Sequence, residues 1–148
     1  MNLPRKFEEY IRMRIVLNGA INKSRAEFLI MEAEKSFNGL KKRLEIMGID
    51  EDNSNSIVKD CYDILMELIR ANLLLKGYNS SGQFAHEAEV AYFKKLNFSD
   101  NETSFLNDLR YFRNSVTYYG KILTVEYAVK VVIFTKRIYP QLVNIINL

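Results

Sequence analysis

Glycine and proline are scarce in this sequence of 148 residues, which contains six glycines and two prolines. The two residue types together make up about 12% of an average protein. Because both of them build turns and interrupt regular structure, their scarcity disfavours a loop-rich, collagen-like or many-turned all-β architecture. We therefore expect long helices, in a chain whose length fits one domain.

Other features are absent or nearly so. A single cysteine, Cys61, excludes a disulfide within the chain and a zinc site built from several cysteines. The first ten residues lack the apolar segment of a signal peptide, and no apolar run approaches the roughly 18 residues that span a bilayer. We therefore predict a soluble cytoplasmic protein that has no membrane partner.

The formal net charge of +3 is small and unevenly distributed. The middle third of the chain is acidic, whereas both ends are basic. This excess is far below that of a dedicated nucleic-acid-binding protein, so charge alone does not predict RNA binding.

Apolar residues recur every three or four positions over most of the chain, as they do on one face of a helix. The pattern predicts long helices at 24–47, 57–76, 99–119 and from 124 onward, with shorter helices after Pro4 and at 84–96. We expect an all-α fold, an antiparallel up-and-down bundle of four long helices with additional short helices, in one domain spanning residues 1–148.

Capping residues mark the expected helix ends. They are the capping boxes Ser24 with Glu27 and Ser99 with Glu102, the N-cap Thr124, and the glycines Gly48, Gly77 and Gly120. The first helix ends or kinks at Asn18 and Gly19, and residues 78–82 form a turn. Pro140 either kinks the last helix or begins a short terminal one.

The last predicted helix is apolar on two faces. It therefore either packs centrally within one chain or associates with a second copy in a two-fold dimer. The sequence leaves both alternatives open.

The segment richest in functional groups is 109–120, which reads LRYFRNSVTYYG. Arg110 and Arg113 lie one helical turn apart, and Asn114, Tyr118 and Tyr119 follow. Guanidinium groups bind phosphate oxygens, an asparagine both donates and accepts hydrogen bonds, and tyrosine rings offer stacking surfaces for bases. A purely structural interpretation is also open, in which Arg113 pairs with Asp63 or Glu67 of the preceding long helix.

Arg113 and Asn114, followed after three residues by Tyr118, resemble the motif of the HEPN superfamily (higher eukaryotes and prokaryotes nucleotide-binding). In that motif an arginine, often followed by asparagine, precedes a histidine by four to six residues. Residues 62–96 are also similar to the preceding part of the family. That segment has Glu67 and Ala71 on a helix with a leucine-rich end, then a glycine, and His86 at the opening of the next helix.

The resemblance implies a dimeric helical bundle whose two motifs face each other, and active members are metal-independent ribonucleases. Carried over, Arg113 binds the phosphate, Asn114 is its polar neighbour, and Tyr118 takes the place of the histidine. A tyrosine with a pKa near 10 is a poor base at neutral pH, so the replacement favours binding over cleavage. Some family toxins carry a tyrosine that a partner nucleotidyltransferase modifies. Gly120 occupies that position here, although Tyr119 is adjacent.

His86 is the only histidine, so a two-histidine metal site is excluded. It is either a structural hydrogen-bonding group or, if the fold brings it near Arg113, a substitute for the missing motif histidine. The acidic residues Glu87, Glu89 and the Asp50–Asp52 run lack the spacing of metal ligands. No phosphate-binding glycine loop and no GxSxG, HExxH or CxxC motif is present, and we expect neither metal nor cofactor.

Three functional hypotheses follow from the sequence. The first is a dimeric HEPN-like protein that binds RNA or a nucleotide through Arg110, Arg113, Asn114, Tyr118, Tyr119 and His86, with weak or no nuclease activity. The second is a metal-independent endoribonuclease that uses Arg113 and Tyr118, as the toxin of a toxin–antitoxin pair with a nucleotidyltransferase partner. The third is a structural interaction module in which Arg113 only forms an ion pair with Glu67 or Asp63.

Overall fold

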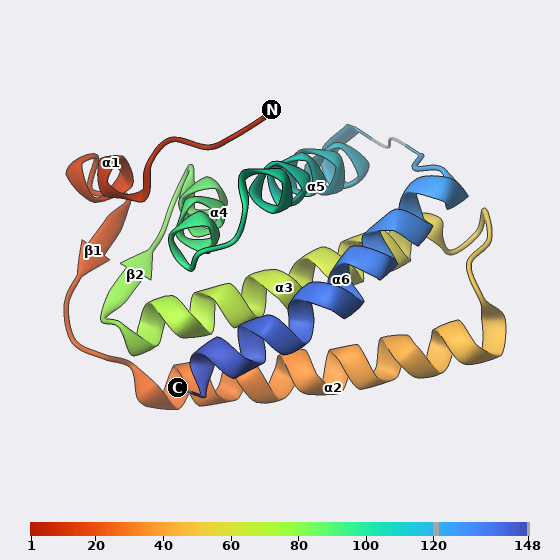
Figure 1. Cartoon of the computed structure of the whole chain (residues 1–148), viewed down its shortest axis with the longest axis horizontal. Helices are drawn as coiled ribbons and strands as arrows, with labels where there is room; N and C mark the ends of the chain where they lie inside the picture. The colour runs from red at the N-terminus through yellow and green to blue at the C-terminus, as the bar shows by residue number, and fades with distance from the viewer. Residues whose placement is uncertain (120–121, 148) are drawn as a thin grey trace.

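The computed structural model describes residues 1–119 and 122–147, with the side chains of residues 117–119 also outside the description. Its elements are α1 (Phe7–Arg12), β1 (Val16–Asn18), α2 (Lys23–Met47), α3 (Ser54–Leu75), β2 (Tyr78–Ser80), α4 (Ala85–Lys95), α5 (Asp100–Tyr119) and α6 (Val125–Ile146). Figure 1 shows α2 and α3 as a long antiparallel hairpin, which α6 crosses obliquely. The helices α4 and α5 lie on the other side of α3.

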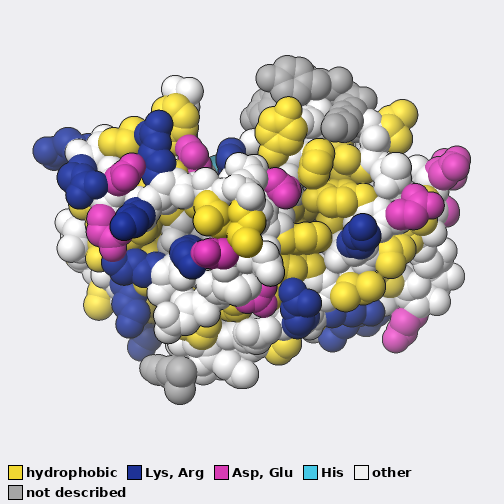
Figure 2. Space-filling view, turned by 45° about the horizontal axis from the view of Figure 1, so that its top comes forward, with side chains coloured by type: hydrophobic (Ala, Val, Ile, Leu, Met, Phe, Trp, Pro, Cys, Tyr) yellow, Lys and Arg dark blue, Asp and Glu magenta, His cyan; other side chains and the backbone are white. Residues whose placement is uncertain are grey.

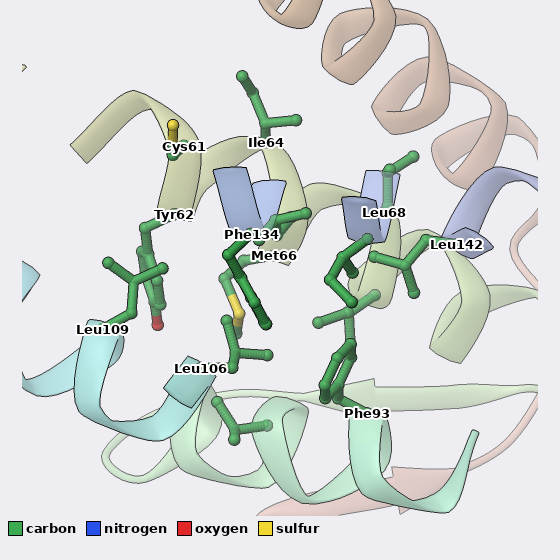
Figure 3. Packing of buried hydrophobic residues seen from close by; sticks show 14 of the residues in the cluster. Cys61, Tyr62, Ile64, Met66, Leu68, Phe93, Leu106, Leu109, Phe134 and Leu142 are labelled. Atoms are coloured by element: carbon green, nitrogen blue, oxygen red, sulfur yellow. The ribbon is translucent and has the colours of Figure 1, made fainter. Parts of the chain in front are cut away.

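The helix α3 is the centre of the molecule and packs against α2, α4, α5 and α6. Its apolar residues occupy more than one face, which explains why neighbours cover it on several sides. Figure 3 shows α3 side chains meeting residues of α4, α5 and α6 in one continuous core. The buried residues in this view include Tyr62, Met66 and Leu68 from α3, Phe93 from α4, Leu106 and Leu109 from α5, and Phe134 and Leu142 from α6.

The prediction of a mostly helical fold is confirmed, but a regular bundle of four helices is not. A two-stranded antiparallel sheet was not predicted. In it Val16 pairs with Ser80, Leu17 with Asn79 and Asn18 with Tyr78. The first helix ends at Arg12 because the chain turns through Arg14 with a φ of 60°, so residues 16–18 extend as a strand instead of completing the helix. Residues 78–80, predicted as part of a turn, form the partner strand.

Most of the helix caps agree with the sequence. Ser99 and Glu102 form a reciprocal capping box at the start of α5, with distances of 2.9 Å and 3.1 Å between backbone nitrogen and side-chain oxygen. Thr124 accepts the Tyr127 N–H at the start of α6, and Gly48 ends α2 with a φ of 67°. The predicted end of α5 at Gly120 lies outside the described residues.

One cap prediction is wrong. Asn22, not Ser24, caps α2, because its Oδ1 accepts the Arg25 N–H at 3.2 Å. At the other end of the chain, α6 continues through Pro140 as one helix, so no separate terminal helix begins there.

The helix α6 buries most of both apolar faces within the chain, including Val131, Val132, Phe134, Ile138 and Leu142. Val129 and Ile133 remain exposed. Among the described residues, no helix is long and apolar enough to span a membrane.

Candidate functional site

A pocket of about 350 Å³ lies between the start of α4 and the second half of α5. Its lining residues come from the loop after β2, from the first turn of α4 and from α5: Gly82, Gln83, Phe84, Ala85, His86, Glu87, Arg110, Arg113 and Asn114. Figure 2 shows a notch at the top of the molecule, at whose base a basic side chain and a histidine are visible beside an acidic side chain. Four of the six residues predicted to bind RNA or a nucleotide therefore meet in one pocket.

Arg113 is held against α3 at the inner wall of the pocket. Its Nη2 lies 3.5 Å from Asp63 Oδ1, and its guanidinium group lies 5.8 Å from the centroid of the Tyr62 ring. The side chain is 21% exposed, so it is fixed by α3 and still reaches the pocket. Burial raises the pKa of Asp63, and the charge of Arg113 opposes that rise.

Of the two carboxylates considered as partners of Arg113, the structure brings Asp63 to it. Glu67 lies one turn further along α3, in a different hollow between α2 and α3 that is lined by Arg43, Asp60 and Asp63 as well. Burial and the charges of Asp63 and Glu32 raise the pKa of Glu67. Glu67 therefore lies behind the pocket and is not part of its lining.

His86 lies at the edge of the pocket, and its Nδ1 lies 3.0 Å from the hydroxyl oxygen of Tyr62. The two rings are nearly parallel, at 14°, with centroids 6.0 Å apart. Partial burial of the imidazole lowers its pKa, and the nearby Arg70 and Arg113 act in the same direction, against Glu89 and Asp63. The lowered pKa favours the neutral imidazole at pH 7, and His86 shares a pocket with Arg113.

Arg110 is oriented by a short chain of hydrogen bonds. Its Nε donates to Asn107 Oδ1 at 3.1 Å, and Asn107 Nδ2 donates to the backbone oxygen of Asn2 at 3.2 Å. Since Asn107 is buried, this arrangement fixes the base of the arginine side chain while its guanidinium group faces the pocket. Asn114 lies one residue beyond Arg113 on the same wall.

On the opposite wall, the sequence singled out His86 as a binding residue but not Phe84. Phe84 borders the pocket as an exposed ring, and its backbone lies in the left-handed region, with a φ of 70°. The helix α4 begins directly after it without a side-chain capping hydrogen bond, and residues of its first turn line the pocket, so the positive end of the helix lies at the pocket. The predicted turn at 78–82, which ends at Gly82 two residues before Phe84, was the signal in the sequence for a loop here.

The remaining predicted binding residues, Tyr118 and Tyr119, have side chains outside the described residues. In the part of the chain that is described, no group of His, Cys, Asp and Glu side chains could hold a metal ion. Asp50, from the acidic run, instead accepts the backbone N–H groups of Asp52 and Asn53 within its loop. Cys61 is buried, and burial raises its pKa to about 11, which disfavours the reactive thiolate.

Three comparisons with known proteins returned no match to this chain: none among family models, none among curated proteins and none among solved structures.

Proposed function

We propose that the chain is a HEPN-like protein that binds the phosphate groups of RNA or of a nucleotide through Arg110, Arg113, Asn114 and His86, with weak or no nuclease activity. One observation carries the proposal: His86 of α4, which is distant in the sequence from Arg110, Arg113 and Asn114 of α5, lines the same open pocket as they do. Two guanidinium groups and the start of α4 supply positive charge there, against the single carboxylate of Glu87 in the lining, and phosphate is the ligand that such an arrangement favours.

The side chain Arg113 is the first to test. Changing Arg113→Ala is expected to lower the affinity for a single-stranded RNA oligonucleotide about 30-fold, since a hydrogen bond to a charged group is worth roughly 2 kcal/mol. Fluorescence anisotropy with a labelled oligonucleotide measures the change. We expect circular dichroism of the variant to match that of the wild type.

Arg43 provides a matched control, because its Nη2 also pairs with an aspartate of α3, Asp60, at 2.7 Å, but outside the pocket. Arg43→Ala should leave RNA affinity unchanged. Asp63→Asn removes the carboxylate charge beside Arg113 and is expected to preserve or increase the affinity. If Arg113→Ala binds RNA as the wild type does, the proposal fails and the structural interpretation of the Arg113–Asp63 pair stands.

The affinity for RNA should depend on pH through His86. Its pKa in the folded protein lies below the ordinary value near 6.5, so the imidazole is neutral at pH 7 and gains its proton only in more acidic solution. Lowering the pH from 7 through the pKa of His86 is then expected to raise the affinity about fivefold, since an added hydrogen bond contributes roughly 1 kcal/mol. Phosphodiesters do not titrate in this range, so the oligonucleotide should lack a terminal phosphate.

The variant His86→Gln separates this effect from the titration of Asp63, whose pKa is raised. We expect it to lose most of the pH dependence, and an unchanged pH profile would contradict the role of His86.

The lowered pKa of His86 also makes the stability of the fold depend on pH. As the pH falls, the unfolded chain binds this proton before the folded protein does. The stabilisation that neutral His86 contributes is therefore present above about pH 6.5, and it is lost as the pH falls through the pKa of His86 in the folded protein.

A second candidate function is metal-independent RNA cleavage, and the shared pocket of His86 and Arg113 is the observation that favours it. A neutral imidazole can accept the proton of a ribose 2′-hydroxyl while an arginine holds the phosphate. This activity predicts cleavage in EDTA that disappears in Arg113→Ala. Loss of cleavage in His86→Gln would identify His86 as the base, whereas loss in Tyr118→Phe would identify Tyr118. A neighbouring gene for a nucleotidyltransferase would favour the toxin–antitoxin pair.

The expected homodimer would form through the face of α5 and α6. Val129 and Ile133 are exposed there, beside a groove lined by Phe105, Phe134 and charged residues of both signs, including Glu102 and Lys130. In a two-fold dimer the same surface of each copy faces its counterpart. A surface that carries both positive and negative charges can therefore pair with itself. Light scattering should give twice the chain mass.

A further inference from the structure

Phe84 has a backbone conformation that an aromatic residue rarely adopts. With a φ of 70° and a ψ of 5°, it lies in the left-handed region, where the Cβ atom of an L-residue is crowded by the backbone. Gly82 in the same loop also has a positive φ, of 76°, but glycine adopts it without strain. The other described non-glycine residues with positive φ, Arg14 and Asn97, carry polar side chains.

Core packing does not account for this conformation. The Phe84 side chain is 45% exposed, and among the side chains that the structure describes no aromatic ring stacks on it. A strained residue persists only where its surroundings impose it, and such residues concentrate at functional sites. The strained loop holds a large apolar ring at the edge of the pocket, where water contacts it.

The ring has charged neighbours across the pocket. Phe84 borders one side, and Arg110 and Arg113 of α5 line the other. Within about 350 Å³ the site thus offers a flat apolar surface close to two phosphate-binding groups. A nucleotide likewise combines a flat base with a charged phosphate, joined through the ribose.

From this arrangement we infer that Phe84 is a stacking platform for an unpaired base whose phosphate Arg110 and Arg113 bind. The inference rests on the proposed function and narrows its ligand to the chemistry shared by single-stranded RNA and free nucleotides. A base within a duplex is already stacked on both faces and is not available to the ring. Duplex RNA and sugar phosphates without a base are therefore poor ligands.

The test compares Phe84→Leu with Phe28→Leu, which removes an exposed ring from α2, outside the pocket. The probes are a single-stranded oligoadenylate, its duplex with oligouridylate, adenosine monophosphate and ribose 5-phosphate, titrated against the full-length chain by calorimetry. Phe84→Leu is expected to lower the affinity for the oligoadenylate and the mononucleotide about tenfold, as removal of a stacking ring does at other sites. Its affinity for ribose 5-phosphate stays at the wild-type value, and Phe28→Leu leaves all affinities unchanged.

Nuclear magnetic resonance supplies a readout that a structural role of Phe84 would not produce. In the wild type, ring protons of Phe84 shift upfield with adenosine monophosphate and do not shift with ribose 5-phosphate. Phe84→Trp retains a ring and keeps the affinity for the mononucleotide, which shows that the loss in Phe84→Leu does not come from misfolding.

Two results would overturn the inference and are distinguishable from failure of the proposed function. One is wild-type protein that binds ribose 5-phosphate as tightly as adenosine monophosphate, or the duplex as tightly as the single strand. The other is an equal loss of affinity for every phosphate probe in Phe84→Leu. If the wild type binds none of the probes, the proposed function itself fails and the inference falls with it.

Discussion

Replacing Arg70 by methionine is expected to lower the free energy of unfolding by about 4 kcal/mol, because the change leaves a buried carboxylate without its partner. Glu89 is 1% exposed, and Arg70 contacts both of its oxygens, with Nε 2.6 Å from Oε2 and Nη2 3.1 Å from Oε1. Methionine retains much of the aliphatic length of arginine, so the loss reflects charge and hydrogen bonding more than packing. Urea denaturation followed by circular dichroism measures it.

Two further variants identify the cause of this loss. Arg70 is 28% exposed, so Glu89→Gln leaves a cation that water can still reach, and we expect a smaller loss of stability. The double variant Arg70→Met with Glu89→Met removes both charges and should recover most of the stability, since a buried ion pair and an apolar pair of similar size are often nearly equivalent. If the double variant is no more stable than Arg70→Met alone, an uncompensated charge is not the reason.

The Arg70–Glu89 ion pair is also expected to affect ligand binding in the pocket. It joins α3 to α4, and His86 lies one turn before Glu89 on α4. The charge of Glu89 opposes the lowering of the His86 pKa, so the pair both positions the imidazole and influences its protonation. Arg70→Met is therefore expected to weaken RNA binding, although Arg70 itself does not line the pocket.

Features that depend on neighbours in the sequence were predictable. The capping box of Ser99 and Glu102 and the Thr124 cap involve residues three positions apart, and the periodic apolar residues of α3 report directly on its buried faces. Local geometry decides such features. Asn22 was missed as the cap of α2 because Ser24 with Glu27 matches the capping pattern equally well.

Features that depend on distant segments were not predictable. The strands β1 and β2 are three residues long, too short to show an alternating pattern. They pair with each other although α2 and α3 lie between them in the sequence. Spacing likewise cannot decide between Asp63 and Glu67 as the partner of Arg113, because the two residues lie one turn apart on the same helix. That choice is made by the position of α5 against α3.

The candidate site shows the same division. The sequence identified Arg110, Arg113 and Asn114 as a cluster because they are adjacent on one helix face or turn. Their proximity to His86 depends on the packing of α4 beside α5, which no local pattern encodes. Phe84 was not predicted as part of the site. Phenylalanine favours a negative φ, so nothing in the sequence indicates the positive φ that Phe84 adopts in this loop.

The second structural prediction concerns Gly77, which precedes β2 and has a φ of 84°. An added Cβ would lie 2.4 Å from the backbone oxygen of Gly19, which is too close for a carbon and an oxygen atom that are not bonded to each other. The two backbones must stay close there, because Gly19 N–H donates to Gly77 O at 2.7 Å, directly beyond the last pair of the sheet. We therefore expect Gly77→Ala to lower the free energy of unfolding by about 3 kcal/mol, from left-handed strain and displaced backbone together.

Two other glycines separate these contributions. Gly82 has a φ of 76° but open space around its Cβ position, so Gly82→Ala should cost only about 1 kcal/mol, the strain alone. Gly39 lies within α2 with open space, and Gly39→Ala should raise the stability by roughly 0.5–1 kcal/mol. If Gly77→Ala costs no more than Gly82→Ala, the close approach of Gly19 is not a constraint on the fold. Because β2 leads directly into the loop that carries Phe84, a displaced sheet should also weaken RNA binding by Gly77→Ala.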